Sequence, residues 1–458
     1  MPNSLLAPRS GLAHELKEML RLALPLVTGQ LSAIGMNVID AMLAGHLDAH
    51  TLGAVAVGTS VWSLALVAAI GVMLALPPSV AQLNGANRRP EIGALFRQAL
   101  WLALALGLLL MIGVHFGGPV LVRAIGVDVA LLPDVTQFLH AISFGAPALT
   151  LFFALRGLSE GFGLTRPTMY FSVFGLALLG PVGYVLMYGK LGFPALGALG
   201  SGIATACVIW IEALAFLLYI AMRTQKYGSL ELFQRFDAPS FVEIRELLRI
   251  GIPMGVSVFM EASLFVAVAL AIGTLGTDVV ASHQIAINVA SVTFMIPLGI
   301  AMATTVRVGH AVGRGDSEGV RGAGAAGLVL TLFAQGFSAV LMLTIPDRIA
   351  SLYTSDGAVI ALAAQLLMLA GFFQFSDGMQ VAASGALRGL KDTRVPMVIT
   401  TFAYWGVGMP VGWWLAFKAG LGARGMWMGL IAGLSMAAVL LTLRFWRLVR
   451  PRAAPAPA

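Results

Sequence analysis

The sequence has few charged residues, one cysteine and no nucleotide-binding motif. Only 11% of its 458 residues are Asp, Glu, Lys or Arg, whereas soluble domains contain about 25%. A soluble globular protein is therefore excluded. The single cysteine, Cys207, excludes a disulfide within the chain. Neither a P-loop nor an H-E-x-x-H motif occurs, so we expect no nucleotide partner, no structural metal and no catalytic residue.

Long apolar stretches make up most of the chain. Stretches of about 20 residues or more can cross ~30 Å of hydrocarbon as helices. Twelve occur, at 22–47, 52–77, 94–115, 134–155, 168–188, 196–222, 248–274, 279–305, 322–345, 358–386, 395–417 and 422–445. We therefore predict an all-α integral membrane protein with twelve transmembrane helices. The first 21 residues are polar and basic, which is typical of a cytoplasmic lead-in rather than a signal peptide.

Basic residues gather on one side of the predicted spans. With the N-terminus inside, 23 of the 28 Lys and Arg residues fall in cytoplasmic segments and five in outer loops. The positive-inside rule then predicts that both termini are cytoplasmic. The same distribution accounts for the net charge of +7, so we expect no nucleic-acid partner.

The two halves of the chain repeat each other. ALRGLSEGFGLTRPTM at 154–169 is similar to ALRGLKDTRVPM at 386–397, and PVGYVLMY at 181–188 to PVGWWLAF at 410–417. Each half contains six predicted spans, an even number, so both have the same orientation and form parallel repeats. We predict a first six-helix bundle at 1–222, a cytoplasmic linker at 223–249 and a second bundle at 250–458.

Four carboxyl groups lie inside the apolar stretches, namely those of Asp40, Glu212, Glu261 and Asp377. Each is at least eleven residues from any Lys or Arg, so we expect no basic partner. An ionised carboxylate in hydrocarbon costs several kcal/mol or more, which favours binding of protons, metal cations or organic cations. Glu261 and Asp377 share a depth of about 16–18 Å from the cytoplasmic end, which predicts one shared cation site. Asp40 belongs to the outer half, and Glu212 is a possible accessory acid.

Several segments resemble the NorM type of the multidrug and toxic compound extrusion (MATE) family over nearly the full length. They include LALPLVTGQLSAIGMNVIDAMLAG at 22–45, IGIPMGVSVFMEAS at 250–263 and FQFSDGMQVAASGALRGLKDTRVPM at 373–397. The resemblance implies an outward-facing V of two six-helix bundles in the inner (plasma) membrane of a bacterial-type cell. It also implies export of cationic amphipathic drugs in exchange for Na⁺ or H⁺, with membrane lipid as a partner and no cofactor besides the coupling ion.

The resemblance implies ion-coupling residues. Glu261 in FMEAS and Asp377 in FSDGM match the acids of the cation site. Asp40 in VID matches the acid of the first helix and is expected to serve both ion and substrate.

The resemblance also implies substrate contacts and one alternative function. Asp356 in YTSDG and Gln284 in SHQ match positions linked to drug contact. Phe294 stands where some relatives have Tyr, and it keeps an aromatic face for a cation. The alternative is a lipid-linked oligosaccharide flippase of the wider superfamily. That function needs a more basic cavity for phosphate, and the acids in the spans count against it.

The topology can be tested directly. A reporter enzyme fused after Ala458 is expected to be active in the cytoplasm, because 23 basic residues fall on that side against five on the other. Activity only in the outer compartment would contradict the orientation and the depths given above.

Overall fold

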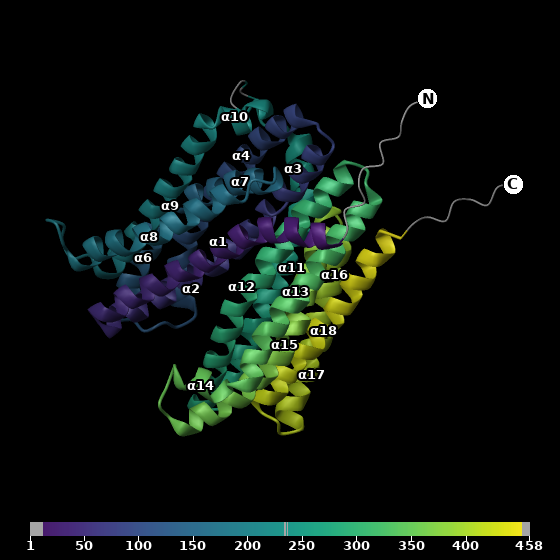
Figure 1. The fold of residues 1–458 in the computed structure, drawn as a ribbon. Coiled ribbons are helices and arrows are strands. Elements are labelled where there is room, and N and C mark those ends of the chain that lie inside the picture. The colour runs from purple at the N-terminus through teal and green to yellow at the C-terminus, as the bar shows by residue number, and fades with distance from the viewer. Residues whose placement is uncertain (1–11, 233–234, 236, 451–458) are drawn as a thin grey trace, which may run out of the picture. The chain divides into compact units, whose positions relative to one another are not determined.

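The computed structural model describes residues 12–232, 235 and 237–450, and this part of the chain is almost entirely helical (Figure 1). η1, η3 and η4 are π-helical segments and η2 is a 3₁₀ turn. The elements are α1 Leu12–Leu47, α2 Ala49–Met73, α3 Leu76–Gly85, α4 Arg89–Ile112, η1 Gly113–Gly117, α5 Gly118–Ala124, α6 Leu132–Ser143, α7 Ala146–Gly161, α8 Arg166–Tyr188, α9 Gly197–Met222, α10 Thr224–Tyr227, η2 Gly228–Leu230, α11 Phe241–Gly273, α12 Thr277–Gly313, α13 Ser317–Thr344, α14 Pro346–Ser351, α15 Gly357–Gly389, α16 Arg394–Thr401, η3 Phe402–Gly408, α17 Met409–Trp413, η4 Trp414–Lys418 and α18 Ala423–Leu448.

Among the described residues, eleven helical segments are long and apolar enough to cross a membrane. A twelfth consists of α6 and α7, which meet at a bend of 43°. Some spans join several elements: α2 continues into α3, α4 into α5, and α16 through η4 forms one segment, Arg394–Lys418. The prediction of an all-α membrane fold with twelve spans is confirmed.

The structure forms two compact units. We call the described residues of Thr28–Phe259 the N-terminal unit, and the described residues up to Val27 together with those from Met260 onward the C-terminal unit. The boundaries lie inside α1 and inside α11, so each of these helices has residues in both units. The division at 222 and 250 was inferred from the repeat alone and remains a prediction.

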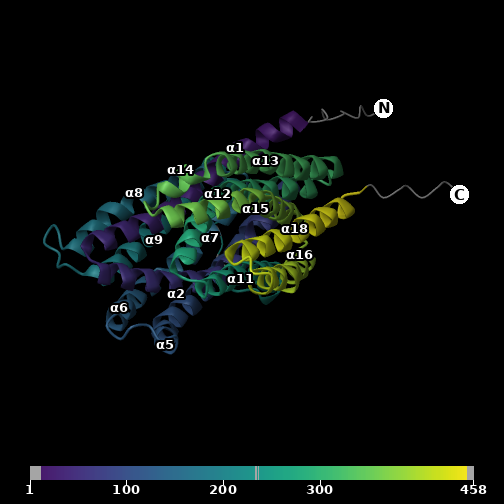
Figure 2. The ribbon, with the colours of Figure 1, turned by 90° about the horizontal axis from the view of Figure 1, so that it is seen from below.

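In the C-terminal unit, α15 is the central helix. It packs against α12, α13 and α18, and Figures 1 and 2 show these four helices side by side. The side chains of Phe373, Trp427 and Phe445 fill the space between them. Thr305 of α12 donates a hydrogen bond to the backbone oxygen of Gly385 at 2.8 Å. The backbone of α15 is therefore held from several sides, which fixes the side chains that it presents.

The first turns of α1 also belong to the C-terminal unit. Glu15 forms an ion pair of 2.6 Å with Arg307 of α12. Met19 and Leu26 are fully buried in a cluster with Ile300. Within the described residues α1 therefore extends back to Leu12, ten residues before the start of the predicted span at residue 22.

In the N-terminal unit, α9 packs against α6, α7 and α8, and α7 packs against α4. Described residues of the linker lie along α4. Arg97 binds the Asp237 carboxylate at 2.5 Å, Gln98 donates to the backbone oxygen of Ala238 at 3.0 Å, and Trp101 donates to that of Asp237 at 3.0 Å. These bonds tie the linker to the unit that precedes it.

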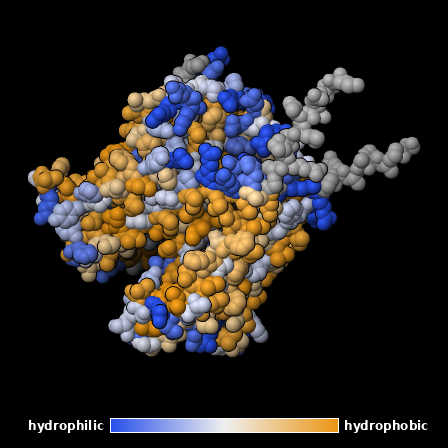
Figure 3. All heavy atoms as spheres, viewed as in Figure 1, coloured by the Kyte–Doolittle hydropathy of each residue, from blue (hydrophilic) through white to orange (hydrophobic). Residues whose placement is uncertain are grey.

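The outer surfaces of the helices are apolar, as expected for contact with lipid. In Figure 3 hydrophobic residues cover much of the visible helix flanks, and hydrophilic residues gather towards the helix ends. On α13, Phe333 is 74% exposed and Phe337 is 67% exposed. Such a continuous apolar surface would be unfavourable in water and is suited to hydrocarbon.

Glycine at 429 is required by a close helix approach in the C-terminal unit. A Cβ at this position would lie 2.3 Å from the Cα of Gly412 on α17. We expect Gly429→Ala to cost about 1–3 kcal/mol through overpacking and to lower the Tm of the detergent-solubilised protein. Gly180→Ala is the matched control, because a Cβ at Gly180 on α8 would meet nothing within 4 Å. Equal Tm values for the two variants would contradict the packing described here.

Candidate ion-coupling site

Glu261 and Asp377 interact inside the C-terminal unit. Glu261 lies on α11 and Asp377 on α15, and their carboxyl groups interact electrostatically. Asp377 is only 3% exposed. Tyr404 of η3 is fully buried and interacts with both acids. Two carboxylates that interact in a low-dielectric surrounding do not readily both stay charged, so the pair is suited to hold a proton or a cation.

Arg388 provides positive charge beside Glu261. It lies on α15, eleven residues after Asp377, and interacts electrostatically with Glu261. The expectation that this acid has no basic partner is therefore wrong. Eleven residues are three helical turns, so Asp377 and Arg388 lie on one face of α15, and the long arginine side chain can reach along that face. Two carboxyl groups and one guanidinium leave one excess negative charge when all three are ionised.

Unpartnered polar atoms gather around these acids. Among the described residues, nine buried side-chain nitrogen or oxygen atoms have no hydrogen-bond partner, and seven of them belong to this part of the C-terminal unit. Buried polar atoms normally have partners, and a group of exceptions is suited to binding a polar ligand or water. The seven atoms are Thr331 Oγ1, Gln335 Oε1, Asp377 Oδ1, Gln380 Nε2, Arg388 Nε and Nη2, and Tyr404 Oη. The Gln380 side chain nevertheless lies close enough to Glu261 to interact with its carboxyl group, without the geometry of a full hydrogen bond.

A glutamine network fixes the helices around Asp377. Gln335 of α13 donates to the backbone oxygen of Gln374 at 3.0 Å and to its side-chain oxygen at 2.5 Å. Gln374 of α15 donates to Thr293 Oγ1 of α12 at 2.6 Å. Gly378 lets α13 approach closely, since a Cβ there would lie 2.5 Å from Gln335 Cγ. Three helices are thus held in register beside the acid pair.

The sequence did not single out several of these neighbours. Gln380 and Arg388 follow Asp377 at intervals of three and eleven residues, a spacing that places all three on one side of an α-helix. The helical spacing from Asp377 could therefore have identified Gln380 and Arg388 in the sequence. Tyr404 and Thr331 come from other spans, and no local pattern links them to α15.

Asp40 lies in the N-terminal unit with two hydroxyl partners. Ser201 donates to one carboxylate oxygen at 3.0 Å and Thr205 to the other at 2.9 Å, both from α9. Asp40 is buried. Its carboxyl group therefore has a built polar site of its own. Glu212, the fourth acid, also belongs to the N-terminal unit.

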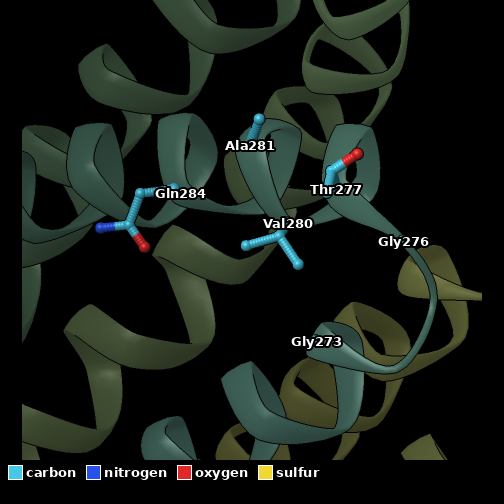
Figure 4. A pocket seen from close by; sticks show the side chains of 6 residues that line it. All are labelled: Gly273, Gly276, Thr277, Val280, Ala281 and Gln284. Atoms are coloured by element: carbon cyan, nitrogen blue, oxygen red, sulfur yellow. The ribbon is translucent and has the colours of Figure 1, made fainter. Parts of the chain in front are cut away.

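The three residues matched to substrate contact have different surroundings. Asp356 is the N-cap of α15 and accepts hydrogen bonds from the amides of Ala358 at 2.8 Å and Val359 at 3.3 Å. Gln284 is exposed on α12 and lines an open hollow of about 450 Å³ at the turn between α11 and α12 (Figure 4). Phe294 is half-buried on α12. Their roles in substrate binding remain predictions.

One segment matches the sequence pattern of a hydrolase motif but lies in a packed helix. Residues 157–161, GLSEG, fit the letters of G-x-S-x-G, which in hydrolases marks a nucleophile on a strand-to-helix turn. Here Ser159 is fully buried inside α7 and hydrogen-bonded to the Tyr227 hydroxyl at 2.9 Å. Its environment is that of helix packing.

The chain is similar to known proteins over nearly its whole length. A probable multidrug resistance protein NorM of Xanthomonas campestris pv. campestris is 49% identical over 97% of this chain and 97% of its own length. The multidrug resistance protein PmpM of Pseudomonas aeruginosa is 42% identical over 95% of this chain and 92% of its own. These bacterial relatives and the apolar spans indicate a multi-pass protein of the inner membrane.

The fold is also known from solved structures. A structure described as an outward-facing conformation of a multidrug resistance MATE family transporter of the MOP superfamily has a TM-score of 0.87 and 20% identity, and covers 95% of this chain and 96% of its own. The crystal structure of the eukaryotic MATE transporter AtDTX14 has a TM-score of 0.83. The MatE family model matches residues 25–185 and matches again at 253–414, one match in each half of the repeat. The chain belongs to the MatE family.

Proposed function

We propose that the chain is a secondary active multidrug efflux antiporter, which exports cationic amphipathic compounds in exchange for Na⁺ or H⁺. The observation that carries the proposal is the group of buried, partly unpartnered polar atoms around Glu261 and Asp377 in otherwise apolar helices. The names of the relatives, multidrug resistance proteins NorM and PmpM, support the substrate class. Both termini are proposed to be cytoplasmic.

The acid pair is proposed to bind the coupling ion. Among the described residues Asp377 Oδ1 and Tyr404 Oη have no hydrogen-bond partner; both oxygens are suitable ligands for Na⁺, and the carboxylate can instead take up a proton. Arg388 balances part of the negative charge. The pair then accepts one positive charge without a large desolvation cost.

Exchange requires that ion and substrate favour different states of the carrier. A ligand shifts a conformational equilibrium only by its difference in affinity between the states. We propose that loading the acid pair with the ion favours release of the cationic substrate, with which it competes. Asp40, Asp356, Gln284 and Phe294 are proposed to contact the substrate, and Asp40 to take part in ion coupling as well.

The lipid-linked oligosaccharide flippase is not proposed. A phosphate-binding cavity needs an excess of positive charge, whereas the group around Glu261 contains two carboxyl groups and one guanidinium. No specific feature of the described residues favours that function.

One experiment can identify the coupling ion. Ethidium transport is measured in inverted membrane vesicles that contain the full chain. A Na⁺ gradient and a pH gradient are imposed separately, each alone. We expect ethidium movement with at least one gradient. Vesicles without the protein serve as the control, and movement that depends on neither gradient would contradict antiport.

Glu261 and Asp377 are expected to act as one site. Glu261→Gln and Asp377→Asn should each weaken ion binding by about tenfold or more. The double variant should add little, because residues that share one ligand are not additive. Ion binding is measured by equilibrium titration of the purified variants, with Asp347→Asn as a control because Asp347 is exposed on α14. Fully additive losses in binding free energy would mean that the two acids act independently.

The Tyr404 hydroxyl is expected to serve the ion rather than stability. Because Tyr404 Oη is buried without a partner, Tyr404→Phe should leave the Tm unchanged or raise it. The same variant should weaken ion binding by roughly threefold to tenfold, the effect of about one lost hydrogen bond. Tyr353→Phe is the matched control, since the Tyr353 hydroxyl bonds exposed Asn288 at 3.2 Å. A lower Tm with unchanged ion affinity would show a structural role.

A further inference from the structure

A second buried group of charges lies in the N-terminal unit, between α7 and α9. Arg156 of α7 donates from Nε to Glu160 Oε1 at 2.6 Å, and the two side chains are 8% and 2% exposed. Its Nη1 and Nη2 atoms both donate to Gln30 Oε1 of α1 at 3.3 Å. The guanidinium therefore joins α7 to α1 and is directly paired with one carboxylate.

Glu212 is the other acid of this group, and it has no direct partner. It lies on α9, is 6% exposed, and accepts no hydrogen bond in the described structure. Its carboxyl group lies against the backbone of α8, because a Cβ at Gly175 would be 2.9 Å from Glu212 Oε2. Thr168 of α8 interacts with the Glu160 carboxyl group and not with Glu212. Arg156 is the cation that acts on Glu212 electrostatically.

The charges of the group do not balance when all are ionised. Glu160 and Glu212 supply two negative charges and Arg156 one positive charge, so one net negative charge would be buried within apolar helices. An isolated buried charge is strongly unfavourable, and a group in this position takes up a proton instead. Glu160 holds the short ion pair, so Glu212 is the group that takes the proton.

We propose that Glu212 is a proton-binding site of the N-terminal unit, separate from Asp40, and that it is protonated while Arg156 is paired with Glu160 and Gln30. Seven residues along α9 separate Glu212 from Thr205, the nearer partner of Asp40. That spacing is about 10 Å, so the two carboxyl groups occupy different sites.

Other ionisable groups on the helices around α9 are accounted for elsewhere. His140 of α6 stacks on His115 with ring centroids 4.2 Å apart. His50 of α2 is paired with Asp134 at 2.8 Å. Arg166 is exposed at the first residue of α8. The charge state of Glu212 is therefore governed by Arg156 and Glu160.

Loss of the proton has a structural consequence. An ionised Glu212 competes for Arg156, and the bonds most easily given up are the two of 3.3 Å to the neutral Gln30 oxygen, because the charged pair with Glu160 is shorter. Deprotonation of Glu212 thus loosens the connection between α7 and α1. Since α1 also carries Asp40, the proton on Glu212 affects the helix that presents an ion-coupling acid.

The test uses difference infrared spectroscopy of the purified full-length protein between acidic and alkaline pH. Wild type is expected to show the carbonyl band of a protonated buried carboxyl group, and Glu212→Gln to lack one component of that band. In Glu160→Gln, Arg156 can pair with Glu212, so this component should be missing at neutral pH. Glu91→Gln, which changes an exposed acid of α4, is the control and should match wild type.

The outcomes separate the proposal from a purely structural role and from the transport function. If Glu212→Gln removes no protonated-carboxyl component, Glu212 is ionised and the proposal is wrong. If that variant does not fold, Glu212→Asp replaces it and should shift the same component. The spectra need no transport activity, so they remain informative even if antiport fails.

Transport gives a second readout. Glutamine imitates the protonated acid, so Glu212→Gln should keep ethidium efflux within about twofold of wild type at the pH where Glu212 is protonated. It should also lose any alkaline decline that wild type shows. Loss of efflux as severe as in Glu261→Gln, with normal expression, would make Glu212 part of the coupling site and would overturn its separate, accessory position.

Discussion

Within hydrocarbon no water is available to pair with polar groups, so every backbone and side-chain polar atom must find its partner inside the protein. The backbone meets this requirement through helices. Asp40 meets it with Ser201 and Thr205, and Glu160 meets it with Arg156. The group around Glu261 and Asp377 does not meet it, since most of the unpartnered buried polar atoms of the described residues lie there. The place where the requirement fails is the place where a positive ligand is expected.

The fold could be predicted from the sequence because length and polarity alone decide which segments can cross a bilayer. The helix ends could not. Within the described residues α1 extends back to Leu12, and there Glu15 pairs with Arg307, a residue nearly three hundred positions away. The single stretch predicted at 134–155 is two helices that meet at 43°. Both departures depend on tertiary contacts or on local breaks that hydropathy does not record.

The candidate site was only half visible in the sequence. A carboxylate inside an apolar run is conspicuous, and Asp40, Glu261 and Asp377 were identified in this way. Their neighbours were not, because Arg388 stands close to the predicted cytoplasmic end of its span, where a basic residue is ordinarily explained by topology. Only the helical spacing between Asp377 and Arg388 shows that the arginine side chain lies on the same face of α15 as the acid. Tyr404 and Thr331 come from separate spans, and their position depends on packing.

The repeat places an arginine at the same point of each half, in ALRGL at 154–158 and at 386–390, yet the two arginines have different partners. α7 continues to Gly161, so Glu160 lies one turn after Arg156 on the helix and pairs with it. α15 ends at Gly389, so the corresponding Asp392 lies beyond the helix and binds Arg444 of α18 at 2.9 Å. Arg388 is then left to act on Glu261. A difference of one helical turn in where the helix ends thus decides whether the arginine neutralises an acid of its own helix or the acid pair of the candidate site.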